Sequence, residues 1–207
     1  MIRSLVLVAI LTALAAPMTA RDDAPRIVAL GDSLTSGRGI GKDEAYPAVL
    51  QKRLVDGGYH YQVVNAGVSG DTTERALRRY RNALDGDVKV LIVALGANDG
   101  LRGVPVERLK SNLSAIIEEA QHRDIAVVLV GMDALPLHGW AYSVAFHLAY
   151  EELAARYAIP LVPFLLVKIM TDPSMMQADR AHPNQAGARA IADRIWPHLQ
   201  PLLKRAD

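Results

Sequence analysis

The sequence predicts an α/β protein in which two layers of helices cover one parallel sheet. Short apolar runs rich in β-branched residues alternate along the chain with longer segments of helical period. The short runs are apolar at consecutive positions, which is typical of strands buried on both faces. Strands that alternate with helices in this way form a parallel sheet. The length of 207 residues favours a single domain around one core.

Five strands follow one another along the chain. The runs that we interpret as strands are "RIVAL", "YQVVNA", "VKVLIVALG", "IAVVLVG" and "IPLVPF". Five parallel strands with helices on both faces make a three-layer α/β/α sandwich, for which we expect the flavodoxin-like strand order 2-1-3-4-5. No repeat, low-complexity tract or linker divides the chain.

Two long helical segments have recognisable signals. Residues 104–123 contain Pro105 near their start, where the missing N–H of proline costs nothing. A last helix is expected over residues 184–203, with Pro197 kinking or interrupting it. The apolar stripe of the first of these helices, which we expect to face the core, consists of Leu109, Leu113, Ile116 and Ile117.

Residues 1–20 differ from the rest of the chain. Arg3 is their only charged residue, residues 5–16 are almost wholly apolar, and small residues lead to Ala20. This is the pattern of a secretory signal peptide, and the apolar run is shorter than the roughly 20 residues that span a bilayer. We expect cleavage near Ala20, no stable membrane insertion afterwards, and a periplasmic or secreted domain over residues 21–207. A membrane anchor is the alternative interpretation.

The composition excludes several classes of protein. The 23 basic and 22 acidic residues nearly cancel, so we expect no basic surface of the kind that binds nucleic acid. The chain has no cysteine. This excludes a disulfide scaffold, a thiol enzyme, a zinc–thiolate site and a lipid anchor on an N-terminal cysteine.

Polar segments follow four of the five expected strands. They are "GDSLTSG" (31–37), "NAGVSGDTT" (65–73), "GANDGLRG" (96–103) and "ADRAHPN" (178–184). In open parallel sheets, ligands bind where the carboxyl ends of the strands meet. The four segments are therefore expected to converge at one edge of the sheet and to form a site there.

These segments contain the groups that a serine hydrolase requires. A serine nucleophile needs a base, a group that orients the base, and donors aimed at the developing oxyanion. Ser33 comes directly after the first strand. Asp179 and His182 are three positions apart, so His182 can accept the serine proton while Asp179 fixes its tautomer. Gly70 has no side chain to keep a backbone N–H from an oxyanion, and Asn98 has an amide donor.

In this order the four segments resemble the sequence blocks of the GDSL or SGNH hydrolases, over residues 26–203. Through "GDSL", "SGDTT", "NDGLRG" and "HPN" they are most similar to the periplasmic branch with thioesterase, lysophospholipase and arylesterase activities. The resemblance implies the SGNH hydrolase fold and no cofactor or metal. It also implies a catalytic triad of Ser33, Asp179 and His182. The implied oxyanion hole consists of the N–H groups of Ser33 and Gly70 and the Asn98 amide.

The chain departs from the pattern of that branch in two of these segments. Ala97 stands where a second glycine is usual, beside Asn98. Arg180 and Ala181 stand where glycine and isoleucine are usual before the histidine, and they add charge near the site. Substrate preference is therefore the property that the resemblance predicts least.

The loop after the fourth strand, "GMDALPLHGWAY", also differs from the proline-rich pattern of the branch. We expect it to overhang the site and to contact the substrate through Leu135, Leu137, His138 and Trp140. Its apolar residues favour an acyl chain. We therefore expect hydrolysis of small-molecule carboxylic esters and thioesters through an acyl-serine intermediate, by a monomer or weak oligomer. The alternatives are a carbohydrate O-deacetylase of the same fold and an exported domain that binds lipids or glycans without catalysis.

Several of these residues have simpler interpretations. A serine after a strand is commonly a helix N-cap, and Asp32, Asp71 and Asp99 are possible caps as well. Asp179 and His182 alone are too few ligands for a metal site. The glycines of "GRGIGK" miss the G-x-G-x-x-G spacing of dinucleotide-binding loops. The remaining histidines that we interpret as surface or half-buried, without an acidic partner at a useful spacing, are His60, His122, His147 and His198.

Overall fold

The computed structural model describes residues 24–205 of the chain. It contains a parallel sheet with the strand order β2-β1-β3-β4-β5. The strands are β1 (Arg26–Gly31), β2 (Gln62–Gly67), β3 (Val88–Ala94), β4 (Ala126–Val130) and β5 (Leu161–Val162). Both the α/β class and the predicted strand order are confirmed. The predicted signal peptide, residues 1–20, lies outside the described residues.

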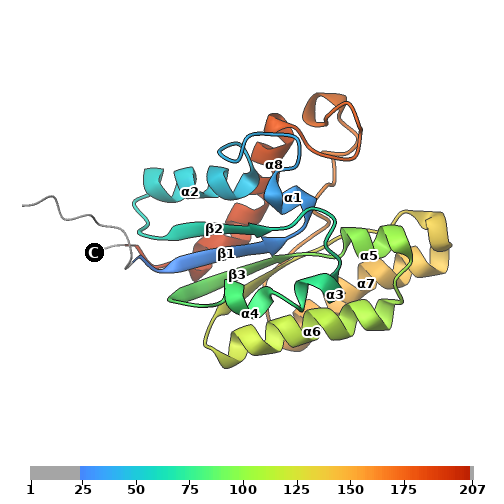
Figure 1. The fold of residues 1–207 in the computed structure, drawn as a ribbon, viewed down its shortest axis with the longest axis horizontal. Helices are drawn as coiled ribbons and strands as arrows, with labels where there is room; N and C mark the ends of the chain where they lie inside the picture. The colour runs from blue at the N-terminus through green and yellow to red at the C-terminus, as the bar shows by residue number, and fades with distance from the viewer. Residues whose placement is uncertain (1–23, 206–207) are drawn as a thin grey trace, which may run out of the picture.

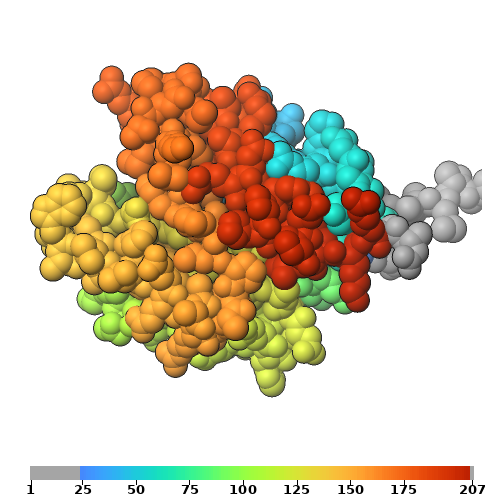
Figure 2. All heavy atoms as spheres, turned by 180° about the vertical axis from the view of Figure 1, so that it is seen from behind, coloured from blue at the N-terminus to red at the C-terminus, as the bar shows by residue number. Residues whose placement is uncertain are grey.

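Helices cover both faces of the sheet and complete three layers (Figure 1). The α-helices are α1 (Ser33–Ser36), α2 (Tyr46–Asp56), α3 (Thr73–Ala76), α4 (Tyr80–Ala83), α5 (Ala97–Arg102), α6 (Val106–His122), α7 (Trp140–Tyr157) and α8 (Gln185–Leu199). The short 3-10 helices are η1 (Pro136–His138), η2 (Pro173–Met175) and η3 (Gln200–Leu202). Helices α2 and α8 pack together on one face, and Figure 2 shows them side by side in cyan and red. Helices α6 and α7 pack together on the other face.

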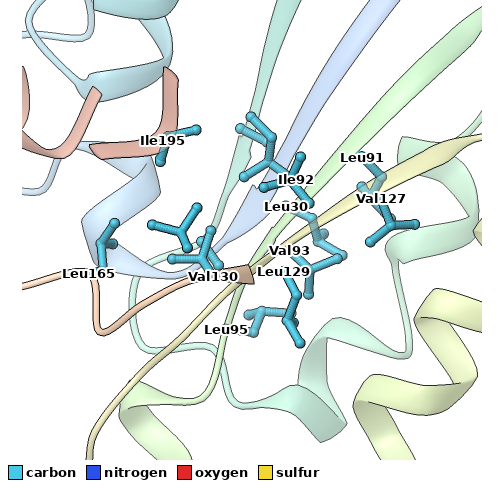
Figure 3. Close-up of a cluster of buried hydrophobic side chains, with 14 of the residues drawn as sticks. Leu30, Leu91, Ile92, Val93, Leu95, Val127, Leu129, Val130, Leu165 and Ile195 are labelled. Atoms are coloured by element: carbon cyan, nitrogen blue, oxygen red, sulfur yellow. The ribbon is translucent and has the colours of Figure 1, made fainter. Parts of the chain in front are cut away.

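The central strands are apolar at consecutive positions because helices cover both of their faces. Residues 27–30 of β1 and 90–95 in and after β3 are fully buried. Figure 3 shows part of this core, in which side chains of β1, β3 and β4 lie together with Ile195 of α8. The core therefore fixes the directions of the strands whose ends carry the polar segments.

Helix α6 has the form predicted for it. It begins at Val106, directly after Pro105. The predicted stripe of Leu109, Leu113, Ile116 and Ile117 is fully buried, which confirms that this side of the helix faces the core. Within residues 24–205, no helix is both long enough and apolar enough to cross a membrane.

The fifth strand is much shorter than predicted. The expected run covers residues 159–164, whereas β5 contains only Leu161 and Val162. Pro160 and Pro163 flank these two residues, and proline has no N–H to donate to a neighbouring strand. The carbonyl of Pro160 still accepts a hydrogen bond from Leu129 N at 2.9 Å. The prolines therefore limit the strand to its two middle residues.

Of the two expected effects of Pro197, a kink or an interruption of the last helix, the interruption is wrong. Helix α8 continues through Pro197 to Leu199 and is followed directly by η3. Pro197 stands in the last turn, where its missing N–H removes one hydrogen bond near the end of the helix. Ile195 and Leu199 remain fully buried, so packing against the sheet holds this turn in place.

Candidate active site

Short helices follow the carboxyl ends of the first three strands. Helices α1, α3 and α5 come after β1, β2 and β3 and lie at the same end of the sheet (Figure 1). Ser33 is the first residue of α1, and Asp32 is its N-cap, whose carboxylate accepts a hydrogen bond from Leu34 N at 3.0 Å. Asp32 therefore caps this helix. The alternative interpretation of Ser33 as the cap is wrong. The Ser33 hydroxyl is available to another partner.

The Ser33 hydroxyl lies beside the imidazole of His182. Ser33 Oγ and His182 Nε2 are 3.1 Å apart, and His182 Nδ1 is 2.6 Å from Asp179 Oδ2. The His182 side chain is only 15% exposed. The structure thus joins three of the predicted site residues in one chain of hydrogen bonds, although Ser33 and His182 are 149 positions apart. A nucleophile, a base and a carboxylate in this order can perform general base catalysis at the serine.

Asp179 is held in its ionised form. Hydrogen bonds from the N–H of Ala181, the ring of His182 and the N–H of His182 lower the pKa of Asp179 well below its usual value. Arg180, between these residues, has a φ of 54°, and this left-handed turn directs both N–H groups towards Asp179 Oδ1 at 3.0 Å. Because an ionised carboxylate only accepts hydrogen bonds, His182 Nδ1 must carry a proton. His182 Nε2 is then free to accept the proton of Ser33.

The histidine loop, residues 176–184, is anchored at both ends. Gln177 N donates to His182 O at 2.8 Å, and Asn184 caps α8. The side-chain amide of Gln177 also donates to Arg38 O at 2.7 Å. Gln177 therefore connects the histidine loop with the segment that follows Ser33 and α1.

Two backbone N–H groups are expected as oxyanion donors. That of Ser33 is at the first position of α1, where a helix provides no acceptor. Gly70 has a φ of 82°, and a Cβ at this position would meet no atom within 4 Å. Glycine is thus required at position 70 by its left-handed backbone rather than by crowding from the protein.

The amide of Asn98 lies between the segments of these two N–H groups. Asn98 Nδ2 donates to Asp32 Oδ2 at 3.2 Å and to Asp71 O at 3.0 Å. Asp32 precedes Ser33, and Asp71 follows Gly70, so the contacts of Asn98 connect all three expected donors. Both N–H bonds of the amide have acceptors here. To stabilise an oxyanion, Asn98 must therefore share one of these N–H bonds between its present acceptor and the oxyanion, or release that acceptor.

Asp32 is a buried acid at the centre of this arrangement. Its side chain is fully buried, and burial raises the pKa of Asp32 to about 6, against the opposing effect of hydrogen bonds from Leu34 N and Asn98. The two donors thus offset part of the desolvation of the carboxylate. It holds Leu34 and Asn98 in place in return.

Asp99 connects three helices rather than capping its own. Its carboxylate accepts from Thr73 N at 2.9 Å and from Thr73 Oγ1 at 2.6 Å, and Asn112 Nδ2 donates to the same hydroxyl at 2.9 Å. Burial raises the pKa of Asp99. These bonds join α3, α5 and α6 beneath the segments of Gly70 and Asn98. Asp71 does not cap α3 either, because Thr72 is the N-cap of that helix.

The residues predicted to contact substrate lie on the surface. Leu135, Leu137 and Trp140 are 50%, 65% and 76% exposed. His138 packs edge-on against Tyr142, and its Nε2 is 3.3 Å from Leu101 O. The loop after β4 is thereby attached to the end of α5, the helix that carries Asn98. None of its described contacts involves Ser33, Asp179 or His182.

The interpretation of His147 as a histidine without an acidic partner is wrong. His147 Nδ1 is 2.7 Å from Asp133 Oδ1, and Nε2 is 3.6 Å from Glu151 Oε1. The hydrogen bond with Asp133 raises the pKa of His147. Glu151 is one helical turn away, a spacing visible in the sequence, whereas Asp133 lies on the loop after β4 and is brought close only by folding.

Two further residues contact the site segments and were not predicted. Gln177 connects the histidine loop to Arg38, and Arg79 donates to Gly31 O, Ala66 O and Asp71. No signal in the sequence distinguishes Arg79 from the other arginines of "RALRRYR", which lie on the surface. Gln177 stands only two positions before Asp179, but its partner Arg38 is 139 positions away.

Known proteins are similar to this chain in sequence and in fold. The model of the GDSL-like Lipase/Acylhydrolase family matches residues 29–190. Esterase TesA of Pseudomonas aeruginosa is 38% identical over 187 residues, covering 90% of this chain and 93% of that protein. Thioesterase 1/protease 1/lysophospholipase L1 of Escherichia coli K12 is 33% identical over 181 residues, covering 87% of this chain and 86% of that protein.

A crystal structure of TesA superposes on the chain with a TM-score of 0.82 at 37% identity, covering 86% of this chain and 99% of the other. The family match includes every residue of the hydrogen-bonded arrangement around Ser33, Asn98 and His182. The chain belongs to the GDSL-like lipase/acylhydrolase family.

Proposed function

We propose that the protein hydrolyses carboxylic esters and thioesters through an acyl-serine intermediate. The observation that carries the proposal is the chain of hydrogen bonds from Ser33 Oγ through His182 to Asp179, at 3.1 and 2.6 Å. Membership of a family of lipases and acylhydrolases supports it, as do relatives named as an esterase and as a thioesterase and lysophospholipase.

In acylation, Ser33 Oγ attacks the acyl carbonyl carbon while His182 Nε2 takes the hydroxyl proton. The oxyanion of the tetrahedral intermediate accepts hydrogen bonds from Ser33 N, Gly70 N and the Asn98 amide. When the intermediate collapses, His182 returns its proton to the leaving alkoxide or thiolate. In deacylation, water takes the place of the alcohol or thiol, and Ser33 regains its proton. Asp179 keeps the proton of His182 on Nδ1 throughout.

The acyl part of the substrate contacts the loop after β4. Leu135, Leu137 and Trp140 offer exposed apolar side chains, which suit an acyl chain better than a sugar. His138 connects this loop to α5 and so to Asn98. A carbohydrate O-deacetylase would be expected to have polar or aromatic stacking groups in place of the two leucines.

Export of the enzyme completes the proposal. The charged start, the apolar run and the small residues before Arg21 have the pattern of a signal peptide. We expect the mature enzyme to act in the periplasm or outside the cell, on small-molecule acyl esters.

The test combines a covalent label with a matched pair of serine variants. A fluorophosphonate is expected to modify Ser33 in the wild type, and Ser33→Ala is expected to lower kcat for a p-nitrophenyl ester by about 10⁴-fold or more without unfolding the protein. Ser36→Ala is the control, because Ser36 lies on the same short helix and only donates to Ser33 O, at 3.3 Å. Wild-type turnover by Ser33→Ala would overturn the proposal. An unlabelled, inactive wild type would indicate the binding domain instead.

A further inference from the structure

We propose that Arg79 is a positioning residue for the oxyanion hole. The inference rests on the proposed function, because it assumes that Ser33 N, Gly70 N and the Asn98 amide are the oxyanion donors. Arg79 belongs to neither the triad nor the oxyanion donors. Its effect on catalysis would be exerted through the segments that hold those donors.

The guanidinium of Arg79 donates to three different segments of the chain. Arg79 Nη2 donates to Gly31 O at 2.9 Å, Nη1 to Ala66 O at 2.7 Å, and Nε to Asp71 Oδ2 at 2.7 Å. Each of its three nitrogen atoms thus has an acceptor. A planar guanidinium can make three such bonds in fixed directions, whereas the ammonium of lysine is a point charge on a flexible stem.

Each acceptor belongs to a segment that carries an oxyanion donor. Gly31 is the last residue of β1 and lies two positions before Ser33. Ala66 is in β2, whose end leads to Gly70, and Asp71 directly follows Gly70. The carbonyl of Asp71 also accepts the hydrogen bond of Asn98 Nδ2 at 3.0 Å, so a shift of Asp71 moves the third donor as well.

The environment of Arg79 differs from that of a surface ion pair. Its side chain is 25% exposed, and the carboxylate of Asp71 is only 3% exposed. The side chain of Arg78, the next residue towards the N-terminus, is 77% exposed and forms an ion pair with Glu74, at 3.7 Å. Exposed ion pairs such as that of Arg78 and Glu74 contribute little to stability. The bonds of Arg79 are shorter, and two of them end on main-chain carbonyls at the edge of the sheet that bears the site.

A loss of this residue is expected to act on the transition state rather than on substrate binding. The oxyanion forms only during the reaction, and small displacements of its donors cost large factors in rate. Removing a whole oxyanion donor lowers kcat by about 10²–10³-fold. Displacing the donors by removing Arg79 is therefore expected to lower kcat by about 10- to 100-fold and to change KM by less than about twofold.

The experiment compares Arg79→Met and Arg79→Lys with the control Arg78→Met. Steady-state hydrolysis of a p-nitrophenyl ester is measured below the melting temperature of every variant, with thermal unfolding recorded in parallel. Both changes at Arg79 are expected to lower kcat, because lysine restores the charge without the three directed bonds. Arg78→Met is expected to keep the wild-type kcat. If Arg79→Met does not fold, Arg79→Lys alone carries the comparison.

A double mutant with Asn98→Ala separates positioning from general loss of structure. If Arg79 acts through the donors, the combined loss in kcat is expected to be clearly smaller than the product of the two single losses. A folded Arg79 variant with wild-type kcat, a lysine variant that keeps full activity, or losses that multiply fully would each overturn the inference. Failure of the proposed function is distinguishable, because the wild type would then remain unlabelled by the fluorophosphonate.

Discussion

Replacing Asp32 with asparagine tests the electrostatics of the buried carboxylate beside Ser33. Burial raises the pKa of Asp32 from 3.8 to about 6. At roughly 1.4 kcal/mol for each pH unit, ionised Asp32 costs the folded state about 3 kcal/mol relative to the unfolded chain. Asparagine has nearly the same shape and keeps an oxygen that can accept from Leu34 N, so the cap of α1 is retained. The side-chain nitrogen of the asparagine takes the place of Asp32 Oδ2 and cannot accept the hydrogen bond from Asn98 Nδ2.

The sign of the effect follows from the raised pKa. Below about pH 3, Asp32 is protonated in both states and costs nothing. Between about pH 3 and pH 6 the unfolded chain ionises first, so the wild type loses stability relative to Asp32→Asn. Above about pH 7 the difference between the free energies of unfolding of Asp32→Asn and the wild type reaches its full value. The lowered pKa of Asp179 affects stability only below about pH 4, and it affects both proteins equally.

The assay is urea-induced unfolding of the wild type and Asp32→Asn at pH 4, 5, 6 and 7. The free energy of unfolding of the variant minus that of the wild type is expected to rise by about 2 kcal/mol over this range, because a small part of the difference is already present at pH 4. The altered bond to Asn98 adds an offset that does not change with pH, so it leaves the slope unaffected. A difference that stays constant from pH 4 to pH 7 would refute the assignment of a raised pKa to Asp32.

Two further predictions concern the histidine loop and the substrate. Gly39→Ala would place a Cβ against Gln177 Oε1, and we expect kcat to fall about tenfold. Gly58→Ala is the control, because Gly58 has a similar left-handed backbone but no atom near the added Cβ. This variant is expected to keep the wild-type kcat. Equal activities of the two variants would contradict this. Trp140→Ala is expected to change the free energy of unfolding by less than about 0.5 kcal/mol but to lower kcat/KM severalfold for long-chain p-nitrophenyl esters and not for the acetate. A uniform change across chain lengths would exclude an acyl contact.

The fold was predictable because its central strands are buried on both faces. Continuous apolar runs such as residues 27–30 and 90–95 occur where helices cover a parallel sheet on both sides. The strand order followed from the fold class. The apolar run of residues 159–164 predicted too long a fifth strand, because Pro160 and Pro163 within it cannot donate to a ladder.

The proximity of Ser33 and His182 was predictable from the same topology. The carboxyl ends of parallel strands meet at one edge of the sheet, so these two residues were expected to lie close together. The supporting contacts were not predictable, since they depend on side-chain directions between distant segments. Arg79 has the same residue type as its exposed neighbours, and Gln177 finds its acceptor at Arg38 only after the loops are packed.

The separation of Ser33 and His182 along the chain has a consequence for biosynthesis. A ribosome makes the serine early and the histidine near the end, 149 residues later. Until then the nascent protein has a hydroxyl without a base, and His182 reaches it only when the histidine loop is anchored between Gln177 and α8. The growing polypeptide therefore lacks the proposed general base until residue 182 has been made.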